Sequence, residues 1–317
     1  MNKVFYIFAF ILLSTINSNC QNLVYNGDFE IYDTCPDNIS HPNNVQLKRC
    51  IGWNSATKGT PDYYNSCSSN IVVSTPINIA GNQIPKSGNA YAGFLAYSYQ
   101  PLPNEIFWWE YLKVELTEML IIDEFYTISF YVSPSELFKY SVSHLGISFV
   151  NYDYFLNDSL PITNLNYIED PINFIDTNNW IKLNYIYQAI GGEKHLIIGN
   201  FRGLNTVLTE INNDTTLNND SYYLIDNVEV NELENNFPNG FTPNGDGIND
   251  LLLFNNLPYE AELTIFNRWG ECVYFSNDSL LSWDGKNQNG IDCTNGVYFY
   301  VIKTNNFTIN RFVHLMR

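Results

Sequence analysis

The chain has 317 residues, a length that accommodates two ordinary domains. Its formal net charge of -18 excludes a nucleic-acid or anionic-lipid binder, because both of those partners need basic patches. Hydrophobic residues make up 45% and aromatic residues 16%, so the composition also excludes a disordered chain. Only 15% of the residues are charged, which leaves a neutral polar surface suited to polar ligands. A codon bias toward Asn, Ile, Tyr and Phe explains the same composition, and we favour that explanation.

Residues 1–20 have the pattern of an export signal. A lysine near the start precedes the apolar run Val4–Leu13, which is too short to span a bilayer. We predict cleavage between Cys20 and Gln21. A lipidated Cys20 is the alternative, disfavoured because Asn17 stands where a lipobox has Leu. The sequence predicts no transmembrane segment.

Cysteines in an exported chain meet an oxidising environment, which favours disulfides. After cleavage they fall into two groups: Cys35, Cys50 and Cys67, then Cys272 and Cys293. Pairing within each group predicts a bridge between Cys272 and Cys293. A second bridge is expected to join two of the three N-terminal cysteines, and the sequence does not choose among them.

Period-two alternation predicts strands through most of the chain. Along Tyr111–Leu116, apolar side chains alternate with Lys113 and Glu115. β-Branched and aromatic residues mark further expected strands in chain order: Tyr126–Val132, Leu145–Val150, Trp180–Tyr187, His195–Phe201 and Tyr222–Val230. No long helical pattern is present. Many short strands without helical crossovers predict an all-β, antiparallel sandwich.

A polar stretch at 231–236 marks a domain boundary, which divides the chain into residues 21–232 and 233–317. The expected strands after it are Leu251–Phe254, Glu262–Asn267, Cys272–Ser276, Gly296–Lys303 and Phe307–Leu315, with a hairpin at 305–306. These segments predict a small, Ig-like β-sandwich.

The second domain carries four sequence motifs in a fixed order: Phe237–Asp250, Phe266–Glu271, Trp283–Gly285 and Gly296–Tyr300. Together they resemble the gliding-motility-associated C-terminal domain of the Bacteroidetes, the type B sorting signal of type IX secretion. The resemblance implies passage through the outer membrane by the type IX machinery and contact with an outer-membrane barrel-type partner. It further implies that the protein ends at the cell surface or in the medium.

The loop that opens this domain resembles a calcium loop. Asn244, Asp246 and Asp250 have an alternate spacing that brings oxygens toward one ion. The alternative, which we favour, is an Asx- and Gly-rich turn held by its own hydrogen bonds, because no bidentate Glu follows.

The ends of the first domain, Leu23–Glu30 and Tyr222–Val230, resemble the ends of galactose-binding-like jelly rolls, the fold of many carbohydrate-binding modules. In that fold the first and last strands lie side by side and often share a structural calcium. The resemblance implies Glu30 and Asp226 as calcium ligands, with backbone carbonyls near Asn26. Ordinary strand-end acids are an equally weighted alternative.

A sugar-binding face needs exposed aromatic rings with polar groups beside them. The candidates are Trp53, Tyr63, Tyr64, Trp108 and Trp109, with Asp62 and Asn65 as polar neighbours. Adjacent residues of a strand point to opposite faces, so one of the paired tryptophans is expected to face outward. Burial in a core is the ordinary alternative for such rings.

The sequence specifies no reaction, because it lacks a G-x-S-x-G elbow, an H-E-x-x-H pair and a P-loop. Four glutamates close in sequence are expected on exposed strand faces and not as a catalytic pair: Glu105, Glu110, Glu115 and Glu118. We therefore expect a non-catalytic, exported protein with a glycan-binding or adhesive first domain. The alternatives are a structural or protein-interaction subunit without a glycan ligand, and an unrecognised hydrolase.

Overall fold

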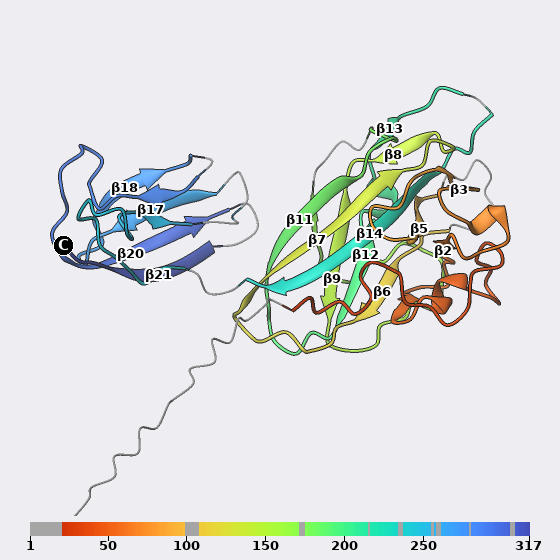
Figure 1. Ribbon diagram of the computed structural model, residues 1–317, viewed down its shortest axis with the longest axis horizontal. Coiled ribbons are helices and arrows are strands. Elements are labelled where there is room, and N and C mark those ends of the chain that lie inside the picture. The colour runs from red at the N-terminus through yellow and green to blue at the C-terminus, as the bar shows by residue number, and fades with distance from the viewer. Residues whose placement is uncertain are drawn as a thin grey trace, which may run out of the picture.

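The computed structural model describes residues 21–98, 108–170, 175–214, 216–233, 237–254, 257, 261–278, 280–304 and 308–317. The export signal, the bond after Cys20, Glu105 and the hairpin at 305–306 lie outside these residues. The described chain is all-β, as predicted, and is built from two β-rich bodies (Figure 1). The helical elements in it are short 3-10 turns: η1 (Gln46–Arg49), η2 (Ile71–Val73) and η3 (Gly203–Asn205). No helix in this part of the chain is long and apolar enough to span a membrane.

The first body is a sandwich of two antiparallel, five-stranded sheets (Figure 1). The order of the first sheet is β1 (Trp53–Ser55), β6 (Leu112–Glu115), β12 (His195–Gly199), β9 (Leu145–Val150) and β10 (Ile168–Asp170). The order of the second sheet is β11 (Ile181–Gln188), β7 (Phe125–Pro134), β14 (Ser221–Glu232), β5 (Ala90–Tyr97) and β2 (Asp62–Asn65). Two small pairs flank them: β8 (Tyr140–Val142) with β13 (Leu208–Glu210), and β3 (Ile77–Asn78) with β4 (Gly81–Asn82).

Alternation along the second sheet divides its residues between two faces. Ile128, Phe130 and Val132 of β7 point into the core between the sheets, where they meet Phe94 of β5 and Ile225 of β14. The opposite face of this sheet is also covered, because loops from elsewhere in the chain fold over it. This second, loop-covered face carries the candidate site.

The two ends of the first domain lie side by side, as the jelly-roll resemblance implied. The backbone N–H of Leu23 donates to the carbonyl of Val230 at 2.7 Å. A Cβ atom on Gly27 would stand 2.0 Å from the Val228 carbonyl oxygen, so this close approach requires glycine.

The second body is a smaller sandwich, drawn in blue in Figure 1. Its five-stranded sheet has the order β15 (Gly240–Phe241), β21 (Thr308–Leu315), β20 (Gly296–Lys303), β17 (Glu262–Phe266) and β18 (Cys272–Ser276). The pair β16 (Leu252–Leu253) and β19 (Ser282–Trp283) packs against it. Trp283 is 1% exposed and lies between the rings of Phe241 and Tyr298.

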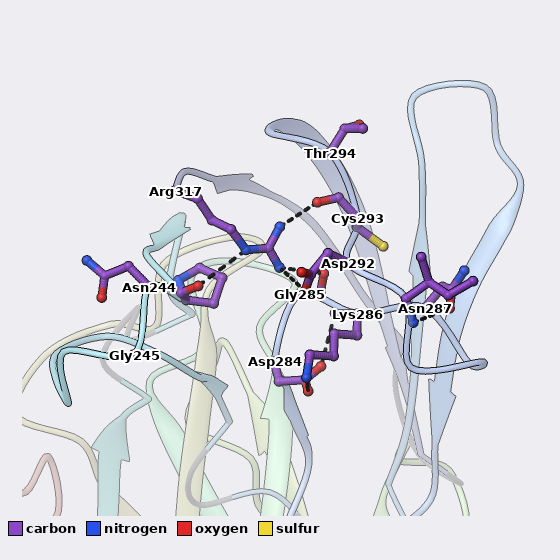
Figure 2. A network of polar contacts seen from close by, with 12 residues as sticks. Asn244, Gly245, Asp284, Gly285, Lys286, Asn287, Asp292, Cys293, Thr294 and Arg317 are labelled. Atoms are coloured by element: carbon purple, nitrogen blue, oxygen red, sulfur yellow. Dashed lines mark hydrogen bonds and ion pairs between the residues drawn. The ribbon is translucent and has the colours of Figure 1, made fainter.

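Arg317, at the end of the sequence, ties three segments of the second body together (Figure 2). Its guanidinium donates to the carbonyls of Pro243 at 3.2 Å, Gly285 at 3.0 Å and Cys293. It also pairs with the Asp292 carboxylate at 3.1 Å. The side chain therefore acts as a clip between the loop that follows β15 and the segment that joins β19 to β20.

The disulfide pattern confirms one prediction and contradicts another. Cys35 and Cys67 are bonded, and Cys50 is the buried free thiol of the N-terminal group. The predicted bridge between Cys272 and Cys293 is wrong, because both are free thiols. Cys272 is exposed on β18, while Cys293 packs against the core of the second body, so the two side chains lie in different surroundings.

Candidate functional site

Four of the five candidate sugar-stacking rings are buried away from solvent, three of them in the cores and Tyr64 on the covered outer face of the second sheet. Trp53 is 1% exposed, and Tyr63 and Trp109 are fully buried. Trp53 stacks on Phe29 and donates its indole N–H to a backbone carbonyl. The expected exposed face is therefore wrong at these positions, because ordinary core packing uses these rings. Trp108 is half-buried, and its ligand contact stays a prediction.

Tyr64 differs from these three rings, because it lies on the covered outer face of the second sheet. Val73 and Ala80, from the chain after β2, pack over it together with Tyr91 and Tyr222. Asn65, an expected polar contact, instead donates to the Tyr63 hydroxyl at 2.7 Å within the core. The loops leave a pocket beside Tyr64.

The pocket has a volume of about 500 Å³. Its apolar lining is Ile39, Ile79, Ala80, Leu95, Leu137, Phe138 and Leu217. Its polar lining is Ser40, Thr60, Asp62, Tyr64, Glu110, Thr216, Asn218, Asp220 and Tyr222. A concave site with apolar walls and a few convergent polar groups is the usual form of a small-ligand site.

Asp62, at the start of β2, accepts hydrogen bonds from three groups around the pocket. The Ser40 N–H donates to one carboxylate oxygen at 2.6 Å, and the hydroxyls of Tyr222 and Tyr64 donate to the other at 2.8 and 3.5 Å. The Tyr64 hydroxyl lies 2.8 Å from that of Tyr222, so the two phenols and the acid form one network. Burial raises the pKa of Asp62 to about 6, although these donors oppose the shift.

Glu110 is the second acid of the pocket, and the expectation that it lies on an exposed face is wrong. It is 3% exposed. One carboxyl oxygen accepts from the N–H and the hydroxyl of Thr60 at 3.0 and 3.1 Å, and the other accepts from the Leu95 N–H at 2.8 Å. Burial first, and then the charge of Asp62, raise the pKa of Glu110 to about 8. The side chain therefore joins the chain before β2 to β5.

The sequence did not reveal this acid pair, because its members come from separate segments. Asp62 was expected only as a polar neighbour of the tyrosines, and Glu110 only as one of several strand acids. The sequence offers one hint that Glu110 is buried: it stands between two large aromatic residues, Trp109 and Tyr111. The structure buries both of these rings completely. Chemically, two buried carboxyl groups and two phenols offer acceptors and donors to hydroxyl or ammonium groups of a ligand.

The residues expected to hold calcium at the ends of the first domain lie around one loop. Glu30 accepts from the N–H groups of Asn89 at 2.6 Å and Ala90 at 2.8 Å, and Asp226 accepts from the Ser87 N–H at 3.1 Å. Burial, with a smaller contribution from the charge of Glu30, raises the pKa of Asp226 to about 7. Two carboxylates facing one loop fit the donor chemistry of calcium, but they already satisfy backbone N–H groups. Calcium there stays a prediction.

The loop at 244–250 uses its own acids internally. Asp250 accepts from the N–H groups of Asn244 at 2.9 Å, Gly245 at 2.7 Å and Gly247 at 2.8 Å, which lowers the pKa of Asp250. Asp246 accepts from the Ile248 N–H at 2.8 Å. These contacts form a hydrogen-bonded turn, and calcium in this loop stays a prediction. Among the residues that the structure describes, no group of three His, Cys, Asp or Glu side chains is arranged to hold a metal.

The outer face of the second body's sheet carries a group of exposed phenylalanines. Phe312 pairs with Phe299, which pairs with Phe266, across β21, β20 and β17. Phe312 is 48% exposed, Phe299 is 47% and Phe275 on β18 is 41%. We call Phe266, Phe275, Phe299 and Phe312 the phenylalanine face. Large apolar side chains gathered on one exposed face make this face a candidate interaction site.

Comparison with known proteins identifies a protein family for the second body. Residues 235–314 match the family model of the CHU_C Type IX secretion signal domain. This match confirms the resemblance carried by the ordered motifs and indicates an exported protein. No curated protein matches the chain.

Solved structures with some similarity include a xylan-binding domain and two adhesin domains. The CBM22-1 xylan-binding domain of Paenibacillus barcinonensis Xyn10C is 13% identical, with a TM-score of 0.32, and the match covers 63% of this chain and 97% of that one. The adhesin domain of Lys-gingipain from Porphyromonas gingivalis W83 is 12% identical, with a TM-score of 0.29, covering 57% and 91%. The adhesin domain of Epf from Streptococcus pyogenes is 12% identical, with a TM-score of 0.24, covering 71% and 76%. These TM-scores are low, and the ligands of those proteins are properties of those proteins alone.

Proposed function

We propose that the protein is exported by type IX secretion and acts at the cell surface or in the medium as a non-catalytic binding protein. Its second domain directs export, and its first domain binds the end of a glycan in the pocket beside Asp62 and Glu110. The family match of residues 235–314 supports the first part. The pocket is the observation that supports the second.

The shape and chemistry of the pocket suit a saccharide. Its volume of about 500 Å³ lies within the range of small-ligand sites. Apolar walls such as Leu137 and Phe138 offer contact to the C–H faces of a sugar ring, while Asp62 and Tyr222 offer hydrogen bonds to its hydroxyls.

The acid pair also favours one competing function, a glycoside hydrolase, because such enzymes use two carboxyl groups. We prefer binding because both Glu110 oxygens accept hydrogen bonds from backbone N–H groups, of Thr60 and of Leu95. An acid held in this way supports the strands and has little freedom to deliver a proton. Release of reducing sugar from a bound glycan, at a rate lost in Glu110→Gln, would favour the hydrolase.

Binding is tested by screening the mature chain against immobilised glycans and measuring the affinity of each hit. Asp62→Asn and Tyr222→Phe are expected to weaken binding at least about tenfold, because each removes part of a buried hydrogen-bond network. Asp28→Asn, at an exposed position of the same domain, is the matched control and should bind as the parent does. A hit unaffected by both pocket variants would place binding elsewhere.

Export is tested separately by removing the chain after Val230 and locating the product. Retention in the periplasm is the expected result. Appearance of the truncated protein at the surface would contradict the role of the second domain.

A further inference from the structure

The charged groups around the pocket all have the same sign. Asp62, Glu110 and Asp220 line it, and no lysine, arginine or histidine does so among the described residues. Neither Asp62 nor Glu110 takes part in an ion pair within the described chain. Their oxygens accept only from neutral donors, namely backbone N–H groups and the hydroxyls of threonine and tyrosine.

A buried pair of like charges without a cation is unfavourable, since burial penalises each charge and each charge penalises the other. Protonation reduces this cost, and burial accordingly raises the pKa of Asp62 to about 6 and, together with the charge of Asp62, the pKa of Glu110 to about 8. A guest with a positive charge removes the same cost directly, because it lets both carboxylates ionise. The pocket is therefore electrostatically matched to a cation.

The remaining lining defines what kind of cation fits. Ile79, Leu137 and Phe138 form apolar walls beside the acids, and Phe138 stacks on Tyr222 with ring centroids 5.1 Å apart. Such walls accommodate a carbon ring better than a hydrated ion. The hydroxyls of Tyr64 and Tyr222 remain near the acids to orient polar groups on that ring.

We infer that the pocket takes a sugar with a free, protonated amine, such as a glucosamine unit, whose ammonium group lies between Asp62 and Glu110. This inference rests on the proposed glycan-binding function and names its ligand class. An N-acetylated sugar has the same ring without the charge and leaves the acids uncompensated. A neutral sugar offers hydroxyls only.

Three probes isolate the amine. They are the β-1,4-linked trimers of glucosamine, N-acetylglucosamine and glucose, titrated calorimetrically into the full mature chain at pH 6, where the amine is protonated. We expect the glucosamine trimer to bind at least about tenfold more tightly than the other two. Asp62→Asn and Glu110→Gln are expected to reduce this ratio to near one.

Proton linkage provides a second readout that does not depend on the variants folding. The titratable groups facing the pocket are Asp62, Tyr64, Glu110, Asp220 and Tyr222. At pH 6 the amine of the ligand already carries its proton, so binding of the ammonium group should release protons only from the acid pair. The heat measured in phosphate and in Bis-Tris should then differ by an amount that gives that number of protons. The neutral trimers should release none.

The outcomes separate this inference from the proposed function. Equal affinity for all three trimers, lost in Tyr222→Phe, overturns the amine and leaves glycan binding intact. No binding of any saccharide in the screen overturns both. Tighter binding of the glucosamine trimer without proton release, unchanged in Glu110→Gln, places the amine outside this pocket and overturns the inference.

Discussion

The hydroxyl oxygens of Tyr64 and Tyr222 lie 2.8 Å apart, although 158 residues separate them in the chain. They belong to β2 and β14, which flank β5 on either side. The residue between them on β5 is Gly93, and a Cβ atom there would stand 2.4 Å from the Tyr222 hydroxyl oxygen. The absence of a side chain at Gly93 therefore lets the Tyr222 ring cross the strand and reach Asp62.

Replacing this glycine tests how the pocket is assembled. Gly93→Ala should displace the Tyr222 ring, destabilise the first domain by about 1–3 kcal/mol and weaken ligand binding. The free energy of unfolding, measured in urea, gives the first effect, and calorimetry gives the second. Gly240→Ala is the control, because a Cβ there meets its nearest atom at 3.6 Å. Equal behaviour of the two variants would show that the ring has room to move.

The free energy of unfolding of the first domain should fall as the pH rises from about 4 to 7, because Asp226 keeps its proton over this range in the folded state. Its pKa is raised from 3.8 to about 7, first by burial, so the folded chain holds a proton that the unfolded chain has released. Between these values the folded state binds more protons, and the free energy of unfolding decreases with increasing pH. Asp226→Asn stays neutral and should make that slope shallower between pH 4 and 7. Chemical denaturation across this range measures it, and an unchanged slope would contradict the assignment.

Ionisation of Asp226 alone should destabilise the first domain, whereas calcium should stabilise the domain with Asp226 ionised. We propose that a calcium ion held by Glu30 and Asp226 stabilises their ionised forms, so added calcium should raise the melting temperature more at pH 8 than at pH 5. Asp226→Asn and Glu30→Gln should lose the calcium response, while Asp250→Asn should keep it. A calcium response retained in both of the first two variants would place the ion elsewhere.

The sequence predicted strands well where side chains alternate in character. The bounds of β9, β18 and β20 were predicted without error, because these strands are rich in β-branched and aromatic residues. The interior strand β5 was missed, since its inward residues are mostly alanines and it contains Gly93. Such residues carry little strand propensity and are held there by the strands on both sides.

The candidate site was less predictable than the strands. The sugar-stacking rings were predicted from residue type alone. Their burial depends on which loops cover each face of the sheet, and the local sequence around a ring does not specify those loops. The pairing of Asp62 with Glu110 arises because Glu110 bridges Thr60 and Leu95 across long sequence separations. The failed disulfide between Cys272 and Cys293 has the same origin, since proximity in sequence said nothing of which face each thiol occupies.

The phenylalanine face of the second domain should matter for export and little for stability. Phe299 and Phe312 are both nearly half exposed, so Phe299→Ser and Phe312→Ser should each change the free energy of unfolding by less than about 0.5 kcal/mol. If the secretion machinery contacts this face, the double variant should accumulate in the periplasm. Phe155→Ser is the control, with a ring 54% exposed on the first domain. Normal export of the double variant would exclude this face as the contact.

For Arg317 we expect a different result from that of the phenylalanine face. Substitutions of Arg317 should reduce export only as far as they destabilise the second domain. Arg317→Ala removes donors to Pro243, Gly285 and Cys293 and should destabilise the second domain by about 1–3 kcal/mol. Arg317→Lys should recover only part of this, since an ammonium group lacks the planar fork that reaches separate carbonyls.

Arg311→Ala is the matched control for the clip, because the Arg311 side chain is exposed and donates to its neighbour's carbonyl. Proteolysis of the folded protein and quantitative export should change in parallel for the alanine and lysine variants of Arg317. The second domain would then have to be folded to direct export. Export lost in Arg317→Ala without increased proteolysis would instead mean that the machinery contacts the arginine itself.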